Sequence, residues 1–90
     1  MAAFRLLIKP SAALELEAIG KQRERRRLVA LISSLGTELR PLGSETLAGH
    51  VALRRIRQGK CRVVYLVDDA QLSAVVIKIG NRREMRRSKS

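Results

Sequence analysis

The feature that most constrains the fold is a stretch of twelve residues, Arg54 to Tyr65, which reads Arg-Arg-Ile-Arg-Gln-Gly-Lys-Cys-Arg-Val-Val-Tyr. Its first half mixes arginines with an apolar residue, and its second half ends in a β-branched and aromatic run, which is typical of two strands. Gln58-Gly59-Lys60 between the halves predicts a tight turn in which Gly59 takes a positive φ. The stretch therefore predicts a β-hairpin.

This hairpin determines where its arginines point. Because side chains alternate between the two faces of a strand, Arg55 and Arg57 are predicted on one face, and Arg54 and Ile56 on the other. Closure of the turn should bring Arg62 near Arg57 on the neighbouring strand. Guanidinium groups offer planar, forked donors and a charge that does not titrate, so three of them on a rigid hairpin predict a phosphate-binding surface.

The chain before the hairpin predicts one strand and two helices. Ala3–Lys9 alternates apolar and polar residues, which indicates an opening strand that Pro10 ends. Ser11 is the predicted N-cap of a first helix, whose apolar residues recur at helical spacing until Gly20 stops it.

A second helix is indicated by a stripe of apolar residues spaced three and four apart. The stripe consists of Leu28, Leu31, Ile32, Leu35 and Leu39. Gly36 is expected to end or fray this helix before the last of them. Since only a short break separates the two helices, we expect them to form an antiparallel hairpin.

In the remaining segments, proline, glycine and aspartate residues predict where loops and turns lie. Arg40–His50 holds a proline and two glycines, so we expect a loop with room for one helical turn. Asp68–Gln71 predicts a turn, and Leu72–Ile79 predicts an apolar strand that Gly80 ends. Asn81–Ser90 forms a basic tail with little to bury.

The predicted order is strand, helix, helix, strand, strand, strand, which places the chain in the α+β class. Three strands joined by short turns form an antiparallel meander, and the first strand adds to the same sheet. A sheet this small needs a second layer, so the helix hairpin should cover one face and leave the other to the arginines. We expect one domain over residues 1–90, with the basic tail at residues 81–90.

The charge of the chain restricts its partners. Lysine and arginine total 19 against 8 acidic residues, for a net charge of +11. This excess favours a polyanionic partner: nucleic acid, the ribosome, an acidic protein or an anionic membrane surface. No apolar run reaches the roughly 20 residues of a membrane span, and no signal-peptide pattern is present, so a cytoplasmic protein is expected.

The cysteine and histidine content of the sequence gives little support to metal binding or redox chemistry. A single cysteine, Cys61, cannot form an internal disulfide and is more typical of a small strand residue than of a nucleophile. One cysteine and one histidine make a structural metal site improbable, and no cofactor is expected.

Several motifs together resemble the RelE/ParE superfamily of toxins from type II toxin–antitoxin modules. They are Leu47-Ala48-Gly49 before the hairpin, the pattern Arg55-x-Arg57-x-Gly59-x-x-Arg62-x-x-Tyr65, and the final Ile79-Gly80-Asn81-Arg82-Arg83. The resemblance covers nearly the whole chain. It implies the β-α-α-β-β-β fold of RelE-like toxins, and a partly disordered, acidic antitoxin as partner. RelE-like members enter the ribosomal A site and cut mRNA without a metal, whereas ParE-like members inhibit DNA gyrase.

The resemblance also implies site residues. The catalytic positions match Arg55, Arg57, Arg62 and Arg82, and further basic residues expected to bind RNA are Arg54, Lys60, Arg83, Arg86 and Arg87. Because the pKa of arginine exceeds about 12, electrostatic stabilisation of the scissile phosphate is the role we assign to these catalytic positions.

The chain departs from the family pattern in ways that bear on activity. The position of a C-terminal catalytic tyrosine is taken by Arg86, the aromatic before the hairpin arginine by Cys61, and a histidine after the final glycine by Asn81. Glu84 is the only carboxylate near the expected site in sequence. The chain can therefore cleave weakly, rely on groups of the ribosomal RNA, or bind without cutting.

Three functions stay open from the sequence: a ribosome-dependent mRNA endonuclease, which we favour, a ParE-like gyrase inhibitor, and a basic nucleic-acid-binding module without toxicity. Two surfaces also stay ambiguous. The run Arg23–Arg27 is either a solvent-exposed helix face or a contact with ribosomal RNA. The apolar helix stripe is core, and part of it is also a candidate groove for an antitoxin segment.

Overall fold

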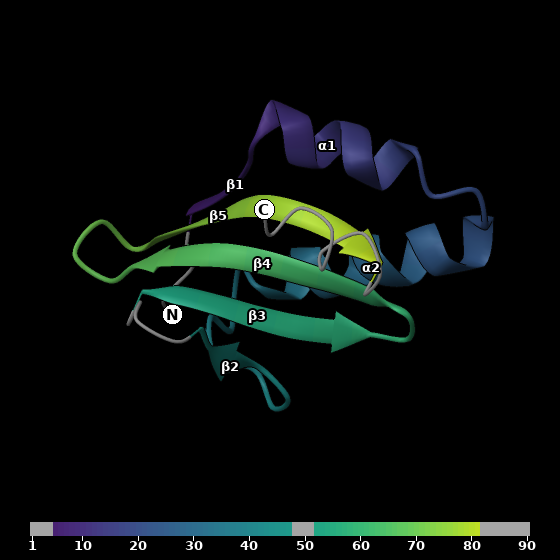
Figure 1. Cartoon of the computed structure of the whole chain (residues 1–90). Coiled ribbons are helices and arrows are strands. Elements are labelled where there is room, and N and C mark those ends of the chain that lie inside the picture. The colour runs from purple at the N-terminus through teal and green to yellow at the C-terminus, as the bar shows by residue number, and fades with distance from the viewer. Residues whose placement is uncertain (1–4, 48–51, 82–90) are drawn as a thin grey trace.

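A computed structural model of the chain describes residues 5–47 and 52–81 (Figure 1). The elements in chain order are β1 (Arg5–Ile8), α1 (Pro10–Glu17), α2 (Gln22–Ser34), β2 (Glu45–Thr46), β3 (Leu53–Gln58), β4 (Cys61–Asp68) and β5 (Ser73–Asn81). The predicted α+β class and the order of the two helices and four longer strands are confirmed. Among the described residues no helix is long and apolar enough to cross a membrane.

The strands form one sheet in the order β1-β5-β4-β3-β2. The β3-β4-β5 meander is antiparallel, as predicted, and β1 joins the same sheet by pairing in parallel with β5. At the β3–β4 turn Gly59 has a φ of 63°, which glycine adopts without the cost that a Cβ would bring. Gln58 pairs with Cys61 across this turn, and that pairing fixes the register of the whole hairpin.

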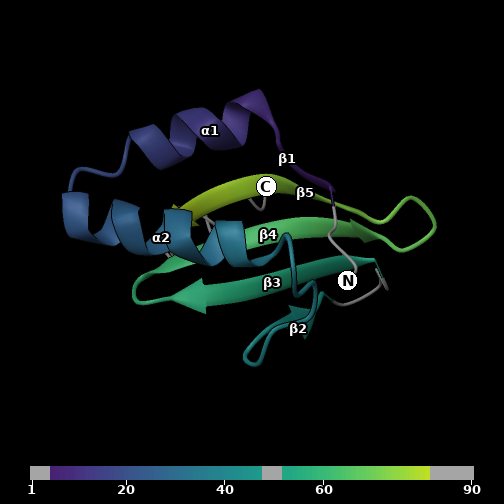
Figure 2. The same cartoon turned by 180° about the vertical axis from the view of Figure 1, so that it is seen from behind.

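Both helices cover one face of the sheet and leave the other open (Figures 1 and 2). Figure 2 shows that the chain runs along α1 and returns through α2, which confirms the antiparallel helix hairpin. Leu28 and Ile32 of α2, together with Leu35 and Leu39 after it, are buried against the sheet. The predicted apolar stripe is therefore the helical half of the core, with Leu31 only partly buried beside it.

The strand side of the core comes from alternate residues of the meander. It consists of Ile56, Cys61, Val63, Tyr65, Val67, Ala74, Val76 and Ile79. Tyr65 is fully buried, and its hydroxyl donates a hydrogen bond of 2.7 Å to the carbonyl oxygen of Leu39. This bond ties the loop after α2 to the centre of the sheet, because it satisfies a carbonyl that burial would otherwise leave without a donor.

The start of α1 differs from the prediction. Ser11 is not the N-cap: Lys9 takes that place with an extended backbone, and Pro10 is the first helical residue. Proline suits this position because its φ is already helical and because the missing N–H has no partner in the first turn. The helix also ends earlier, at Glu17, with Ala18 as its C-cap and Gly20 in the connection to α2.

Two further boundaries differ on the sheet. The segment predicted as a loop contains β2, whose Glu45 and Thr46 pair with Arg55 and Arg54. Gly80 does not end the last strand: β5 continues to Asn81, and Gly80 pairs with Arg62. A strand of two residues carries no periodic signal. Glycine weakens a strand but does not prevent pairing, and here Ile79 and Asn81 on either side of Gly80 also pair with β4.

The outer edge of β5 is protected by a side chain where its partner strand stops. β1 leaves the sheet at Lys9, whose N–H donates to the Val76 carbonyl at 2.9 Å. Beyond that point Glu15 of α1 accepts a hydrogen bond of 2.9 Å from the N–H of Ile79 and pairs with Lys78 Nζ at 2.6 Å. One carboxylate thus satisfies an edge amide that would otherwise be available to another chain.

Candidate functional site

Three arginines of the hairpin lie on the open face of the sheet. Arg55 and Arg57 alternate with Ile56, whose side chain is only 5% exposed and belongs to the core on the helix side. Arg57 pairs directly with Arg62, so the predicted proximity of these two residues is confirmed by the register. Arg55, Arg57 and Arg62 are called the arginine cluster below.

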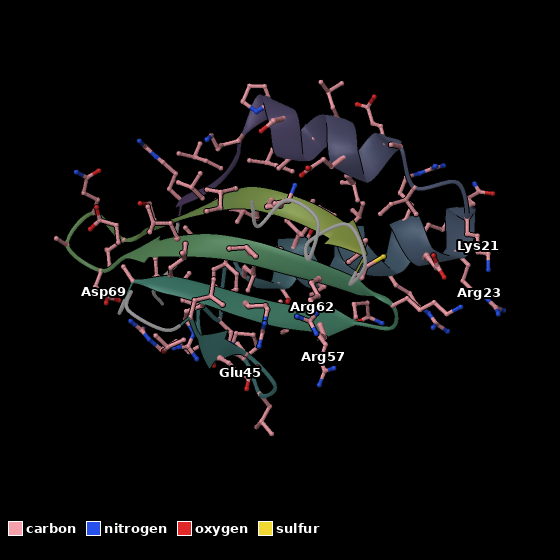
Figure 3. All side chains as sticks on the ribbon, in the orientation of Figure 1. Lys21, Arg23, Glu45, Arg57, Arg62 and Asp69 are labelled. Carbon is pink, nitrogen blue, oxygen red and sulfur yellow. The ribbon has the colours of Figure 1, made fainter. Side chains whose placement is uncertain are left out.

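Strand β2 adds a carboxylate to this cluster. Glu45 pairs with Arg55 across the two strands, and its Oε1 accepts a hydrogen bond of 2.9 Å from Arg55 Nη2. This bond, with the nearby charges of Arg55, Arg57 and Arg62, lowers the pKa of the Glu45 carboxyl below its usual range. Figure 3 shows Glu45, Arg57 and Arg62 gathered on the same part of the open face, far from Asp69 at the opposite end of the sheet.

The charges in this group do not balance. Arg57 and Arg62 are direct cross-strand neighbours, an arrangement of like charges that costs roughly 0.2–1 kcal/mol. One carboxylate stands against three guanidinium groups, which leaves a net charge of +2 on a small area. Such an area favours the binding of an anion that can accept several hydrogen bonds at once, as a phosphodiester does.

The cluster is open to a ligand and held by its surroundings. Arg57 is exposed, whereas Arg62 and Arg55 are half-buried, with 29% of the Arg55 side chain exposed. On the far side of Arg62 its partner on β5 is Gly80, which carries no side chain. At this position β5 therefore presents no side chain beside Arg62.

Arg54, also predicted from the sequence to bind RNA, is not part of the arginine cluster. Arg54 lies on the helix side of β3, where its guanidinium donates to Ser44 Oγ at 2.9 Å and to Thr46 Oγ1 at 3.0 Å. Its Nε is buried and has no hydrogen-bond partner among the described residues. Arg54 thus holds β2 and the loop before it in place, and it does not face the arginine cluster.

Lys60 occupies the exposed turn of the hairpin. It borders an open pocket of about 580 Å³ between the helix connection and the ends of β4 and β5. Lys21, Lys78, Glu15 and Glu24 also line this pocket, so both cations and carboxylates border it. No group of acidic, histidine or cysteine side chains suited to a metal ion occurs among the described residues.

The predicted catalytic residue Arg82 and the predicted RNA-binding residues Arg83, Arg86 and Arg87 lie outside the described residues, as does Glu84. The sequence analysis missed Glu45, because β2 was not foreseen and a glutamate in a predicted loop has no assigned neighbour. One signal could have found it: Glu45 is the only acidic residue between Arg40 and Asp68. It was therefore the acidic residue nearest in sequence to Arg55.

The fold is that of the RelE toxins. The chain is similar to RelE in the archaeal RelE-RelB complex from Pyrococcus horikoshii OT3, with a TM-score of 0.78 and 24% identity over 91% of this chain and 97% of that one. The RelB-RelE antitoxin-toxin complex from Methanococcus jannaschii gives a TM-score of 0.78 and 15% identity over 93% and 99%. The intact E. coli RelBE toxin-antitoxin complex gives a TM-score of 0.75 and 23% identity over 88% and 96%.

Comparison with protein-family models and with curated protein sequences gives no match. The likeness to these proteins is therefore one of fold, at sequence identities below 25%.

Proposed function

We propose that this protein is the toxin of a type II toxin–antitoxin system and that it cleaves mRNA on the ribosome. The observation that carries the proposal is the arginine cluster: three guanidinium groups with one carboxylate on the open face of a RelE-like sheet. Two arginines paired directly across strands repel each other, so the pairing of Arg57 with Arg62 lowers the stability of the sheet. A bound phosphodiester offsets this repulsion, which favours a binding role for the cluster over that of a plain solvent-exposed surface.

The proposed chemistry is transfer of the phosphoryl group within the RNA strand. The ribose 2′-oxygen attacks the adjacent phosphorus, the bond from phosphorus to the 5′-oxygen breaks, and a 2′,3′-cyclic phosphate forms. Negative charge builds up on the non-bridging oxygens as this happens. In this proposal Arg57 and Arg62, which pair across the hairpin, donate to these oxygens. Preorganised donors of this kind typically contribute about 10²–10³-fold each to a rate.

An antitoxin is the second proposed partner. The similar structures from P. horikoshii, M. jannaschii and E. coli are complexes of a RelE toxin with a RelB antitoxin. The net charge of +11 here favours an acidic antitoxin that is partly disordered before it binds.

The first test is controlled expression in a bacterial host with mapping of mRNA 5′ ends before and after induction. Arg57→Gln removes one charge of the cluster at an exposed position, so the fold should survive. Arg40→Gln is the matched control: it also removes one exposed arginine, but at the far end of the sheet, where Arg40 pairs with Asp69 at 2.8 Å. We expect cleavage within translated codons for the wild type and the control, and a loss of about 10²-fold or more for Arg57→Gln.

Three results would contradict the proposal. Equal cleavage by the wild type and Arg57→Gln would show that the cluster does not contact the phosphate. Growth arrest accompanied by a DNA-damage response and no new mRNA ends would favour inhibition of DNA gyrase instead, and no growth arrest would favour a binding module without toxicity.

A further inference from the structure

Cleavage of RNA through the 2′-hydroxyl needs a group that removes its proton, and arginine is a poor base because its pKa lies above about 12. Glu45 is the only carboxylate that the structure describes beside the arginine cluster. The other acidic residue that β4 directs to this face, Asp68, lies six residues from Arg62 along the strand, or about 20 Å.

The contacts of Glu45 leave half of its carboxylate available. Oε1 is held by Arg55 Nη2 at 2.9 Å, which fixes the orientation of the group. Within the described part of the chain no hydrogen bond is made by Oε2, and the side chain is 64% exposed. One oxygen therefore anchors the carboxylate to the cluster, and the second can accept a proton from a ligand bound there.

We propose that Glu45 is the general base of the cleavage reaction, an inference that rests on the proposed nuclease function. In this step Oε2 takes the proton from the ribose 2′-hydroxyl as the new bond from the 2′-oxygen to phosphorus forms. The bond from phosphorus to the 5′-oxygen breaks, and the leaving oxygen takes a proton from water. The proton on Glu45 is then released to solvent, so atoms and charges balance over the turnover.

The surroundings of Glu45 set its strength as a base. Because its arginine neighbours favour the ionised form, the carboxylate is fully deprotonated near neutral pH. It is a weak base for the same reason. The arginines that weaken it also stabilise the charge that develops on the phosphate, so the two effects act on the same transition state in opposite directions.

Two other roles for Glu45 make different predictions. If it only positions Arg55, glutamine should replace it with little loss, because the amide oxygen still accepts the Arg55 hydrogen bond. If it occupies the phosphate site as an internal competitor, glutamine should strengthen RNA binding and raise the rate. A general base alone requires that Glu45→Gln bind normally and react slowly.

The experiment measures single-turnover cleavage of mRNA on programmed ribosomes between pH 6 and pH 9. Wild type, Glu45→Gln, Glu45→Asp and the control Glu17→Gln are compared; Glu17 is an exposed acidic residue on α1. We expect Glu45→Gln to be about 10²–10⁴-fold slower with unchanged ribosome affinity while it stays folded at the assay temperature, and Glu45→Asp to recover part of the rate. The wild-type rate should be level across this pH range, whereas the residual rate of Glu45→Gln should rise with pH, because hydroxide then replaces the missing base.

The outcomes separate the two proposals. Cleavage by Glu45→Gln at the wild-type rate or faster, while the wild type cuts normally, overturns the role of Glu45 and leaves the nuclease function intact. The same holds if Glu45→Gln is slow only because it binds the ribosome weakly or unfolds. Absence of cleavage by the wild type overturns the nuclease function and the role of Glu45 with it.

Discussion

Replacement of Tyr65 by phenylalanine tests the central hydrogen bond of the fold. Tyr65 is fully buried, and its hydroxyl donates to the Leu39 carbonyl at 2.7 Å. Phenylalanine keeps the ring and its packing but removes the donor, so the carbonyl of Leu39, a residue that is 2% exposed, loses its partner away from water. Leaving a buried acceptor unsatisfied costs about 1–3 kcal/mol.

With a central value of about 1.5 kcal/mol, the melting temperature should fall by roughly 6–12 °C, because a chain of this size loses about 4–8 °C per kcal/mol. Thermal and urea unfolding of Tyr65→Phe measure this loss. Thr37→Val is the matched control, since it removes a hydroxyl that donates to the Ser34 carbonyl at an exposed turn, where two backbone amides also donate to that oxygen. Its stability should stay within about 0.5 kcal/mol of the wild type.

The same variant separates a structural role of Tyr65 from a catalytic one. Because its hydroxyl points into the core and not toward the arginine cluster, Tyr65→Phe should cleave mRNA at the wild-type rate at temperatures where it is folded. A loss of stability below about 0.5 kcal/mol, or a large loss of activity in the folded variant, would refute this account of the residue.

Three further predictions concern single positions. Gly59→Ala should destabilise by roughly 1–2 kcal/mol, because a φ of 63° is unfavourable for alanine although no atom lies within 4 Å of the added Cβ; Gly59→Asn should recover much of this in the same thermal unfolding assay. The Cys61 thiol, 5% exposed, should react with a thiol reagent only as fast as the protein opens, and rapid labelling under native conditions would contradict its burial. The lowered pKa of Glu45 adds stability above the usual carboxyl pKa of 4.5, so the stability difference between wild type and Glu45→Gln should shrink as urea unfolding is repeated from about pH 7 to pH 3, and a difference that grows would refute it.

The sequence predicts the parts of this fold that rest on local pattern. The period-two alternation of Arg55, Ile56 and Arg57 and the turn at Gly59 predict the hairpin and the approach of Arg62 to Arg57. The structure shortens the predicted Gln58–Lys60 turn to two residues, because Gln58 belongs to β3 and pairs with Cys61. The helix stripe from Leu28 to Leu39 predicts which side of α2 enters the core. Both inferences need only contacts close in sequence.

Other features depend on pairings that local pattern does not encode. Strand β2 exists because Glu45 and Thr46 pair with β3, and two residues have no period of their own. The alternation of side chains along β3 correctly predicts that Arg54 points to the helix side of the sheet. Only the structure shows that Ser44 and Thr46 accept hydrogen bonds from its guanidinium group. For the same reason the sequence shows that Glu45 is present, but not that its side chain lies beside the arginine cluster.

The parallel pairing of β1 with β5 has a consequence for how this protein is made. These strands are the first and the last that the structure describes, so Leu6 meets Ala74 only after nearly every other element has been synthesised. Contacts so far apart in sequence slow folding, because the loop they close must be ordered before the contacts form. On a translating ribosome the sheet therefore stays incomplete until β5 has left the exit tunnel. During that interval the five-stranded sheet that supports the arginine cluster has not closed.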